Sequence, residues 1–280
     1  PVGRRFDGLP WTLPVIDSQG ILLAGSSGAG KSAVEWALNI GLAPALVAGV
    51  VRLVGIDPKG MELYQGRRFF DEYADDPEDI VELLEQQVVE MRARRNALRD
   101  AGVRKFTPCV ATPLVLIEVD ELAYVTQLLG DKKLQARGRV ALQTLLTQGR
   151  ATGYQVLGAI QDPRKETLED RDLFQIAVAL RLPREMVLLV LGRDAVTAGA
   201  DTSAIPLGDA GAGTGYVLDE ARAVEPVHVR ASWASDSAIG EWERYIVAAR
   251  SAGPQMASAG SWQPVRTEAA EVLAPMPRAV

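Results

Sequence analysis

The residues that could do chemistry begin with one glycine-rich run. The run and the residue after it are Gly25, Ser26, Ser27, Gly28, Ala29, Gly30, Lys31, Ser32 and Ala33. It fits the pattern G-x-x-x-x-G-K-[ST] and lies between an apolar stretch and a helical pattern, which is the required context. The glycines let backbone amides turn toward phosphate oxygens, while Lys31 would reach the β- and γ-phosphates and Ser32 would bind Mg²⁺. We therefore expect a P-loop that takes ATP and Mg²⁺.

An acidic pair follows the apolar run at residues 113–119. Asp120 would hold Mg²⁺ through water, and Glu121 would orient and polarise the attacking water, as in a Walker B strand. A plain acidic strand end is the alternative, but the P-loop favours the catalytic interpretation. Glu118 shares a face with Asp120, because side chains two apart on a strand point the same way. Whether Glu118 has an auxiliary role or forms an ion pair stays open.

A third candidate, Gln161, follows the apolar run at residues 154–160. A polar residue at this strand end would lie beside the P-loop strand in a doubly wound sheet. Gln161 could therefore sense the γ-phosphate. The alternative is a glutamine in an ordinary surface loop.

Positioning these residues requires a sheet that gathers strand ends. Apolar runs alternate with helical patterns, which predicts an α/β fold with a doubly wound, mostly parallel sheet. We expect a short strand near residues 11–15, a helix from Lys31 that ends at Gly41, and a terminal hairpin at residues 215–218 and 223–229. Residues 1–250 would form one domain, and the Ala-, Ser-, Gly- and Pro-rich residues 251–280 a flexible tail or linker.

The amino-acid composition excludes several classes of protein and of functional site. The chain has 280 residues, 48% of them hydrophobic, and a net charge of −6. A single cysteine and a single histidine exclude an internal disulfide framework, a cysteine-based zinc site and most catalytic triads. The sequence has no signal peptide and no apolar run of the roughly 18 residues that a membrane span needs. We expect a cytoplasmic protein, on the cytoplasmic face of a membrane if an anchor precedes residue 1.

Four stretches together resemble the FtsK/SpoIIIE family of DNA-pumping ATPases. They read GSSGAGKS, IDPKGMEL, LVLIEVDELA and GRATGYQVLGAIQDP, and the resemblance covers roughly residues 10–230. AIQDPRKE and RDLF are most similar to the actinobacterial TraB-type proteins, which move double-stranded plasmid DNA in conjugation. The resemblance implies a RecA-like motor domain that forms a hexameric ring around duplex DNA, with ATP at the subunit interfaces.

The resemblance also implies roles for cations outside the P-loop. Arg150 would be an arginine finger that acts on the neighbouring subunit's nucleotide, since a guanidinium neutralises transition-state charge. DNA contacts would come from Arg164, Lys165, Arg171 and Arg184, which would bind phosphates without reading sequence. Solvated surface charge is the alternative for each of these four.

Two other functions remain open at this point. Type VII secretion ATPases share the implied fold and move proteins, but they usually carry several motor domains, and only one P-loop occurs here. A nucleotide-gated regulatory module without motor activity is the second. The combination of Lys31, Asp120 and Glu121 argues against it, because such a module has no need of a water-orienting glutamate.

Overall fold

A computed structural model describes residues 1–164, 170–219 and 225–252 of the chain. Three predicted features lie wholly or partly outside these ranges. They are Lys165, residues 223–224 of the second hairpin strand, and residues 253–280 of the predicted tail. The boundary between domain and tail at residue 250 therefore stays a prediction.

Strands and helices alternate along most of the chain. The elements are β1 (Gly3–Arg5), β2 (Pro10–Trp11), β3 (Ile21–Ala24), α1 (Lys31–Val47), β4 (Val51–Ile56), β5 (Glu72–Ala74), α2 (Pro77–Asp100), β6 (Leu114–Val119), α3 (Lys132–Gln148), β7 (Tyr154–Ile160), β8 (Ile176–Leu180), α4 (Arg184–Thr197), β9 (Thr214–Asp219), β10 (Val227–Ala231) and α5 (Asp236–Ser251). Short 3-10 helices at Tyr64–Phe69, Arg150–Thr152, Arg171–Leu173 and Thr202–Ala204 and a π-helical turn at Tyr124–Leu128 complete the set.

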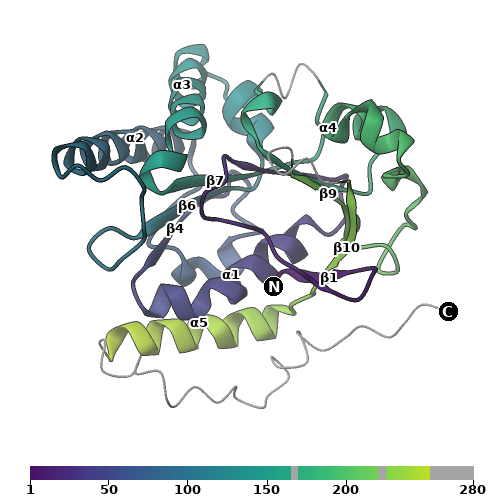
Figure 1. Ribbon diagram of the computed structural model, residues 1–280, viewed down its shortest axis with the longest axis horizontal. Coiled ribbons are helices and arrows are strands. Elements are labelled where there is room, and N and C mark those ends of the chain that lie inside the picture. Colours follow the sequence, from purple (N-terminus) through teal and green to yellow (C-terminus); the bar gives the residue numbers. More distant parts are fainter. Residues whose placement is uncertain (165–169, 220–224, 253–280) are drawn as a thin grey trace.

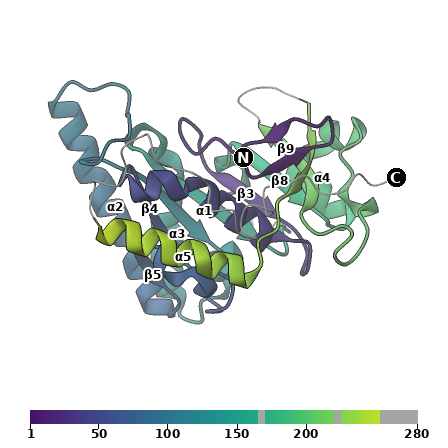
Figure 2. The same cartoon turned by 90° about the horizontal axis from the view of Figure 1, so that it is seen from below.

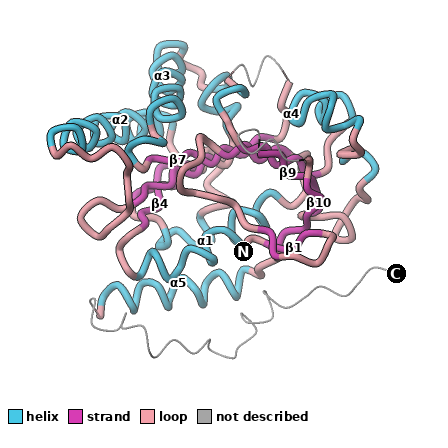
Figure 3. Tube along the Cα trace, viewed as in Figure 1, coloured by secondary structure: helices cyan, strands magenta, loops and turns pink. Residues whose placement is uncertain are grey.

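The ten strands of the described residues join one sheet in the order β2-β1-β10-β9-β8-β3-β7-β6-β4-β5. Figure 3 draws the strands of this sheet in magenta. The strands from β8 to β5 pair in parallel, whereas β9, β10, β1 and β2 extend the sheet by antiparallel pairing. The predicted doubly wound, mostly parallel sheet with a terminal hairpin is confirmed. The strand expected near residues 11–15 is wrong in its bounds: β2 ends at Trp11, and the sequence analysis missed β1 and β5.

Helices cover both faces of the sheet. In Figure 1, α2, α3 and α4 lie on one side and α1 and α5 on the other, and Figure 2 shows α5 running along α1. The central strand β3 alternates between the two cores, because Leu22 and Ala24 pack with the first helix group, and Ile21 and Leu23 with the second. A parallel strand buried on both faces is a continuous apolar run for this reason.

Helix α1 is longer than predicted. Gly41 does not end it, and the helix continues to Val47 with Pro44 inside. A proline inside a helix costs about 3 kcal/mol. Ala43 and Leu46 are buried in the core beside it, so apolar burial in the last turns favours helix despite the proline.

The longest helix, α2, has 24 residues, with Asp76 and Pro77 at its start. Ile80, Leu84 and Met91 are buried, and the other side of the helix is charged. Its amphipathic pattern is that of a helix packed on a core. Among the helices of the described residues, none is both long and apolar enough to cross a membrane.

Gly153, directly before β7, has a backbone conformation and a close contact that disfavour any side chain. Its φ is +75°, and a Cβ placed there would lie 2.2 Å from the Phe106 ring. Gly153→Ala should cost about 2–4 kcal/mol of unfolding free energy, since left-handed strain and overpacking add. Gly102→Ala is the matched control, because its φ is +68° and nothing lies within 4 Å; it should cost about 1 kcal/mol. Equal losses in urea unfolding would contradict the Phe106 contact.

Candidate functional site

The predicted chemical residues meet at the carboxyl edge of the parallel strands. β7 lies between β3 and β6 in the sheet, so the ends of these three strands are neighbours. The Gly25 amide donates to the carbonyl of Ile160, at 3.1 Å, which puts the start of the P-loop directly beside Gln161. Polar groups that follow parallel strands collect at one edge, which is where ligands bind in open α/β sheets.

The glycine-rich loop is shaped by two residues with positive φ. Gly28 has φ +70° and Gly30 has φ +91°, and α1 begins at the next residue, Lys31. A Cβ on Gly30 would lie 2.2 Å from the backbone nitrogen of Gly213, and that nitrogen donates to the carbonyl of Ala29 at 2.8 Å. The loop therefore rests on the segment that leads into β9.

Lys31 is almost completely buried at the start of α1. Its Nζ donates to the Gly25 carbonyl at 3.0 Å. Burial lowers the pKa of the Lys31 ammonium, whereas the nearby carboxylates of Glu35, Glu121 and Asp120 raise it. The ammonium thus lies across the base of the loop, among acidic groups.

Asp120 and Glu121 are buried at the end of β6. Burial, together with the nearby carboxylate of Asp57, raises the pKa of Asp120 to about 6 against the opposing ammonium of Lys59. Burial also raises the pKa of Glu121, against the ammonium of Lys59 and the amide of Gln161. The structure therefore brings Lys31, Asp120, Glu121 and Gln161 to one site.

The donor set fits a magnesium ion bound together with phosphates. The described residues hold no group of three His, Cys, Asp or Glu side chains arranged as a metal cage. Mg²⁺ in nucleotide sites is usually held by one or two protein oxygens, with phosphates and water completing its shell. Asp120 Oδ2 is buried and has no hydrogen-bond partner among the described residues, and Ser32 offers a hydroxyl in the first turn of α1.

Arg150 lies at the opposite edge of the sheet. It starts the 3-10 turn Arg150–Thr152, just before the amino end of β7, and its side chain is exposed. The seven residues of β7 span roughly 20 Å at about 3.3 Å per residue. Arg150 therefore cannot reach the P-loop of its own chain.

The three predicted DNA-contacting arginines in the described residues are not gathered on one surface. Arg164 follows the carboxyl end of β7 and pairs with Asp162. Arg184 begins α4 after β8 and pairs with Asp201. Arg171 lies in the 3-10 turn before the amino end of β8, where it contacts Asp172 at 3.3 Å.

Two buried acids that the sequence analysis left without a role lie behind the site. Glu118 is fully buried and accepts a hydrogen bond from Asn39 Nδ2 at 3.0 Å; burial raises its pKa to about 8. Glu35, four residues after Lys31 on α1, is also fully buried, and burial together with Asp120 and Glu118 raises its pKa well above the usual value. Its i, i+4 spacing from Lys31 is a sequence signal that could have found it.

Glu118 makes a prediction about pH. Because its pKa is raised to about 8 from 4.5, the folded chain keeps a proton that the unfolded chain loses. Stability should therefore fall as pH rises from about 4.5 to about 8, by up to about 1.4 kcal/mol per pH unit. Glu118→Gln keeps the acceptor for Asn39 and should flatten this slope in urea unfolding with EDTA present. An unchanged slope would contradict the buried neutral carboxyl, and Glu82→Gln, on the surface of α2, is the control.

Comparison with known proteins gives relatives of one kind. The FtsK/SpoIIIE family model matches residues 2–125. The "DNA translocase FtsK" proteins of Staphylococcus aureus strains Mu50 and COL are each 26% identical over 185 residues, which is 60% of this chain and 23% of the relative. The chain thus spans less than a quarter of the length of these curated relatives.

Solved structures share the fold at lower identity. The pCW3 conjugation coupling protein TcpA, in a monomer form with ATPγS, superposes with a TM-score of 0.70 at 19% identity, over 87% of this chain and 69% of that one. The type VII secretion ATPase EccC of Thermomonospora curvata gives 0.65 at 22%, over 88% and 30%. The fold is therefore that of P-loop ATPase motor domains. The resemblance seen in the motifs is borne out over residues 2–125, where the FtsK/SpoIIIE family model matches the chain.

Proposed function

We propose that residues 1–250 are an ATP-driven motor domain that translocates double-stranded DNA. The observation that carries the proposal is the meeting of Lys31, Asp120, Glu121 and Gln161 at one strand edge, next to a glycine loop with positive-φ residues at 28 and 30. These are the parts that phosphoryl transfer needs, since catalysis there depends on positioning and charge stabilisation.

The residues would divide the work as follows. Backbone amides of the loop at residues 25–33 and the N-terminus of α1 would bind the triphosphate, and Lys31 would leave the Gly25 carbonyl for its phosphate oxygens. Ser32 and Asp120 would hold Mg²⁺, which supplies charge neutralisation on the phosphates. Glu121 would orient the attacking water, and Gln161 beside it would respond to the γ-phosphate. Burial raises the pKa of the Glu121 carboxyl, which suits an acceptor of a water proton.

Arg150 would complete a site on another copy of the chain. Its exposed position at the amino edge supports a role in trans, because it lies a whole strand length from its own P-loop. A closed ring satisfies this head-to-tail relation for every subunit, and we propose a hexamer.

The names of the relatives support DNA as the substrate, and we propose that it is double-stranded. The curated relatives are DNA translocases, and TcpA is a conjugation coupling protein. Arg164, Lys165, Arg171 and Arg184 are the proposed phosphate contacts, although pairing of three of them with aspartates means that DNA would have to displace those carboxylates. The motor would work in the cytoplasm, at the membrane if an anchor lies outside residues 1–280, in plasmid transfer of the TraB type or in chromosome segregation.

Protein translocation is the second candidate. The superposition with EccC covers as much of this chain as that with TcpA, so the fold alone does not separate the two substrates. The names of the sequence relatives favour DNA as the substrate. Salt-sensitive binding to duplex DNA would support the DNA motor, whereas binding to an apolar peptide would support the protein-translocating alternative.

ATP hydrolysis with and without duplex DNA tests the proposal. The wild-type chain should hydrolyse ATP faster with duplex, and Lys31→Ala and Glu121→Gln should each lower the rate by about 100-fold or more, because they remove phosphate binding and water orientation. Lys132→Ala, on the surface of α3, should match the wild type. A hydrolysis rate that does not change with duplex DNA would favour the protein-translocating alternative. No hydrolysis, at protein concentrations high enough for rings to form, would refute the catalytic roles.

Mixing two inactive variants tests the trans role of Arg150. Arg150→Ala should lower the rate by about 10³-fold while it still binds ATP, as loss of an arginine finger does. When it is mixed with Glu121→Gln, some interfaces join an intact Glu121 to an intact Arg150, so activity should reappear. Mixtures that stay inactive although mixed assemblies form would argue against action between subunits.

A further inference from the structure

The motif IDPKG, which the proposed mechanism leaves without a task, forms a tight turn after β4. The Gly60 amide donates to the Asp57 carbonyl at 2.9 Å, with φ +60° at Gly60. Asp57 is fully buried, and its Oδ2 accepts from the Leu63 amide at 2.9 Å and from the Tyr73 hydroxyl at 3.3 Å. The backbone on both sides of Lys59 is therefore anchored.

This anchored turn directs Lys59 toward Glu121. β4 and β6 are parallel neighbours, with Ile56 opposite Val119, so the segments after them leave the sheet side by side. Lys59 Nζ lies 3.8 Å from Glu121 Oε2. The Glu121 side chain is 9% exposed and that of Lys59 is 46% exposed, so a lysine from the surface reaches a nearly buried carboxylate.

Lys31, the other ammonium near Glu121, forms a different contact. Its Nζ is engaged by the Gly25 carbonyl, and in the proposed mechanism it moves to the phosphates. Glu121 Oε1 is buried without a hydrogen-bond partner among the described residues. Backbone amides of Gln161 and Ala123 also act on the Glu121 carboxylate, and Lys59 adds a charged contact at Oε2. A charged pair fixes a nearly buried carboxylate more firmly than a neutral contact does.

We propose that Lys59 is a positioning residue for Glu121, whose ion pair with Oε2 holds the carboxylate where it can orient the attacking water. The inference rests on the proposed ATPase function. Lys59 makes no contact with the reacting phosphate in this scheme and acts through Glu121. A misplacement of a reacting group by about 1 Å can cost 100-fold in rate, so loss of the pair should appear in the rate of hydrolysis rather than in nucleotide affinity.

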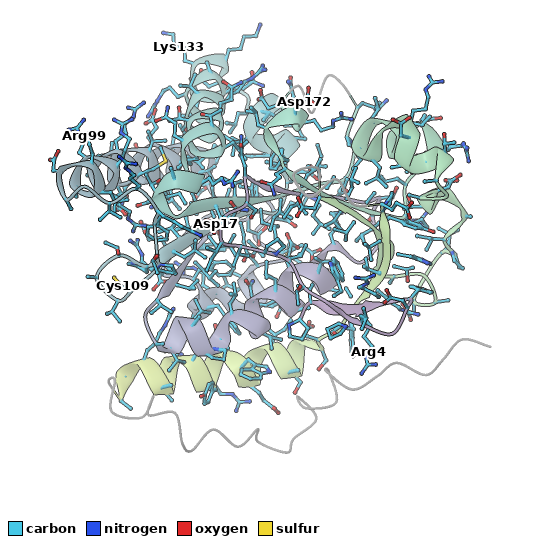
Figure 4. The ribbon with its side chains drawn as sticks, viewed as in Figure 1. Arg4, Asp17, Arg99, Cys109, Lys133 and Asp172 are labelled. Atoms are coloured by element: carbon cyan, nitrogen blue, oxygen red, sulfur yellow. The ribbon has the colours of Figure 1, made fainter. Side chains whose placement is uncertain are left out.

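Steady-state ATP hydrolysis by Lys59→Ala, Lys59→Met and Lys59→Arg tests this role, with binding of a fluorescent ATP analogue measured in parallel. Alanine and methionine should each lower kcat by about 10- to 100-fold, with KM and the analogue's Kd within twofold of wild type. Arginine should recover much of the loss, because it restores the charge. Methionine keeps the apolar stem, which separates charge from packing. Lys133→Ala, at the free end of α3 in Figure 4, should match the wild type.

A double variant shows whether Lys59 acts through Glu121. If it does, Lys59→Ala combined with Glu121→Gln should be no slower than Glu121→Gln alone, because residues that act as a unit are not additive. A slower double variant, or a raised KM and Kd with unchanged kcat, would overturn the inference in favour of a direct phosphate contact. Wild-type kcat in Lys59→Ala overturns it as well. If the wild-type chain itself fails to hydrolyse ATP, the proposed function fails and the inference with it.

Discussion

Lys31 lies among several buried acidic side chains at the end of the sheet. Glu35, Asp120 and Glu121 act directly on the Lys31 ammonium, and Glu118 acts on Glu35. Lys59 is a second ammonium near this group. Buried charge is costly unless it is paired, so burial raises the pKa of all four acids. The arrangement is stable only if helix α1, strand β6 and the turn after β4 hold their side chains in register. The two hydrophobic cores on the faces of the sheet hold these elements in place.

The glycine loop is fixed by the same tertiary framework. The start of the loop donates hydrogen bonds to the segments on either side: the Gly25 amide donates to the carbonyl of Ile160 on β7, and the Ser26 amide donates to the carbonyl of Arg181 after β8. Gly213 supports its other end, at a distance that leaves no room for a side chain on Gly30. Backbone hydrogen bonds thus tie the loop to the ends of β7 and β8.

The two edges of the sheet carry different tasks. The carboxyl edge gathers the groups for phosphate chemistry, and the amino edge presents Arg150 on a turn shaped by Gly153 and Phe106. A strand length separates the two, so one copy of the chain cannot use both on the same nucleotide. Under the proposed mechanism, the complete site therefore needs two copies of the chain.

The P-loop, the acidic pair after β6 and the parallel sheet could be predicted from sequence, because each depends on local spacing: glycines before a helix, acids after an apolar run, strands alternating with helices. Contacts between distant segments could not. The ends of α1 and β2, the added strands β1 and β5, the packing of Gly213 on Gly30, and the approach of Lys59 to Glu121 all depend on which strands become neighbours. The order of the strands is set by packing between segments that are distant in sequence, and no local pattern encodes that packing.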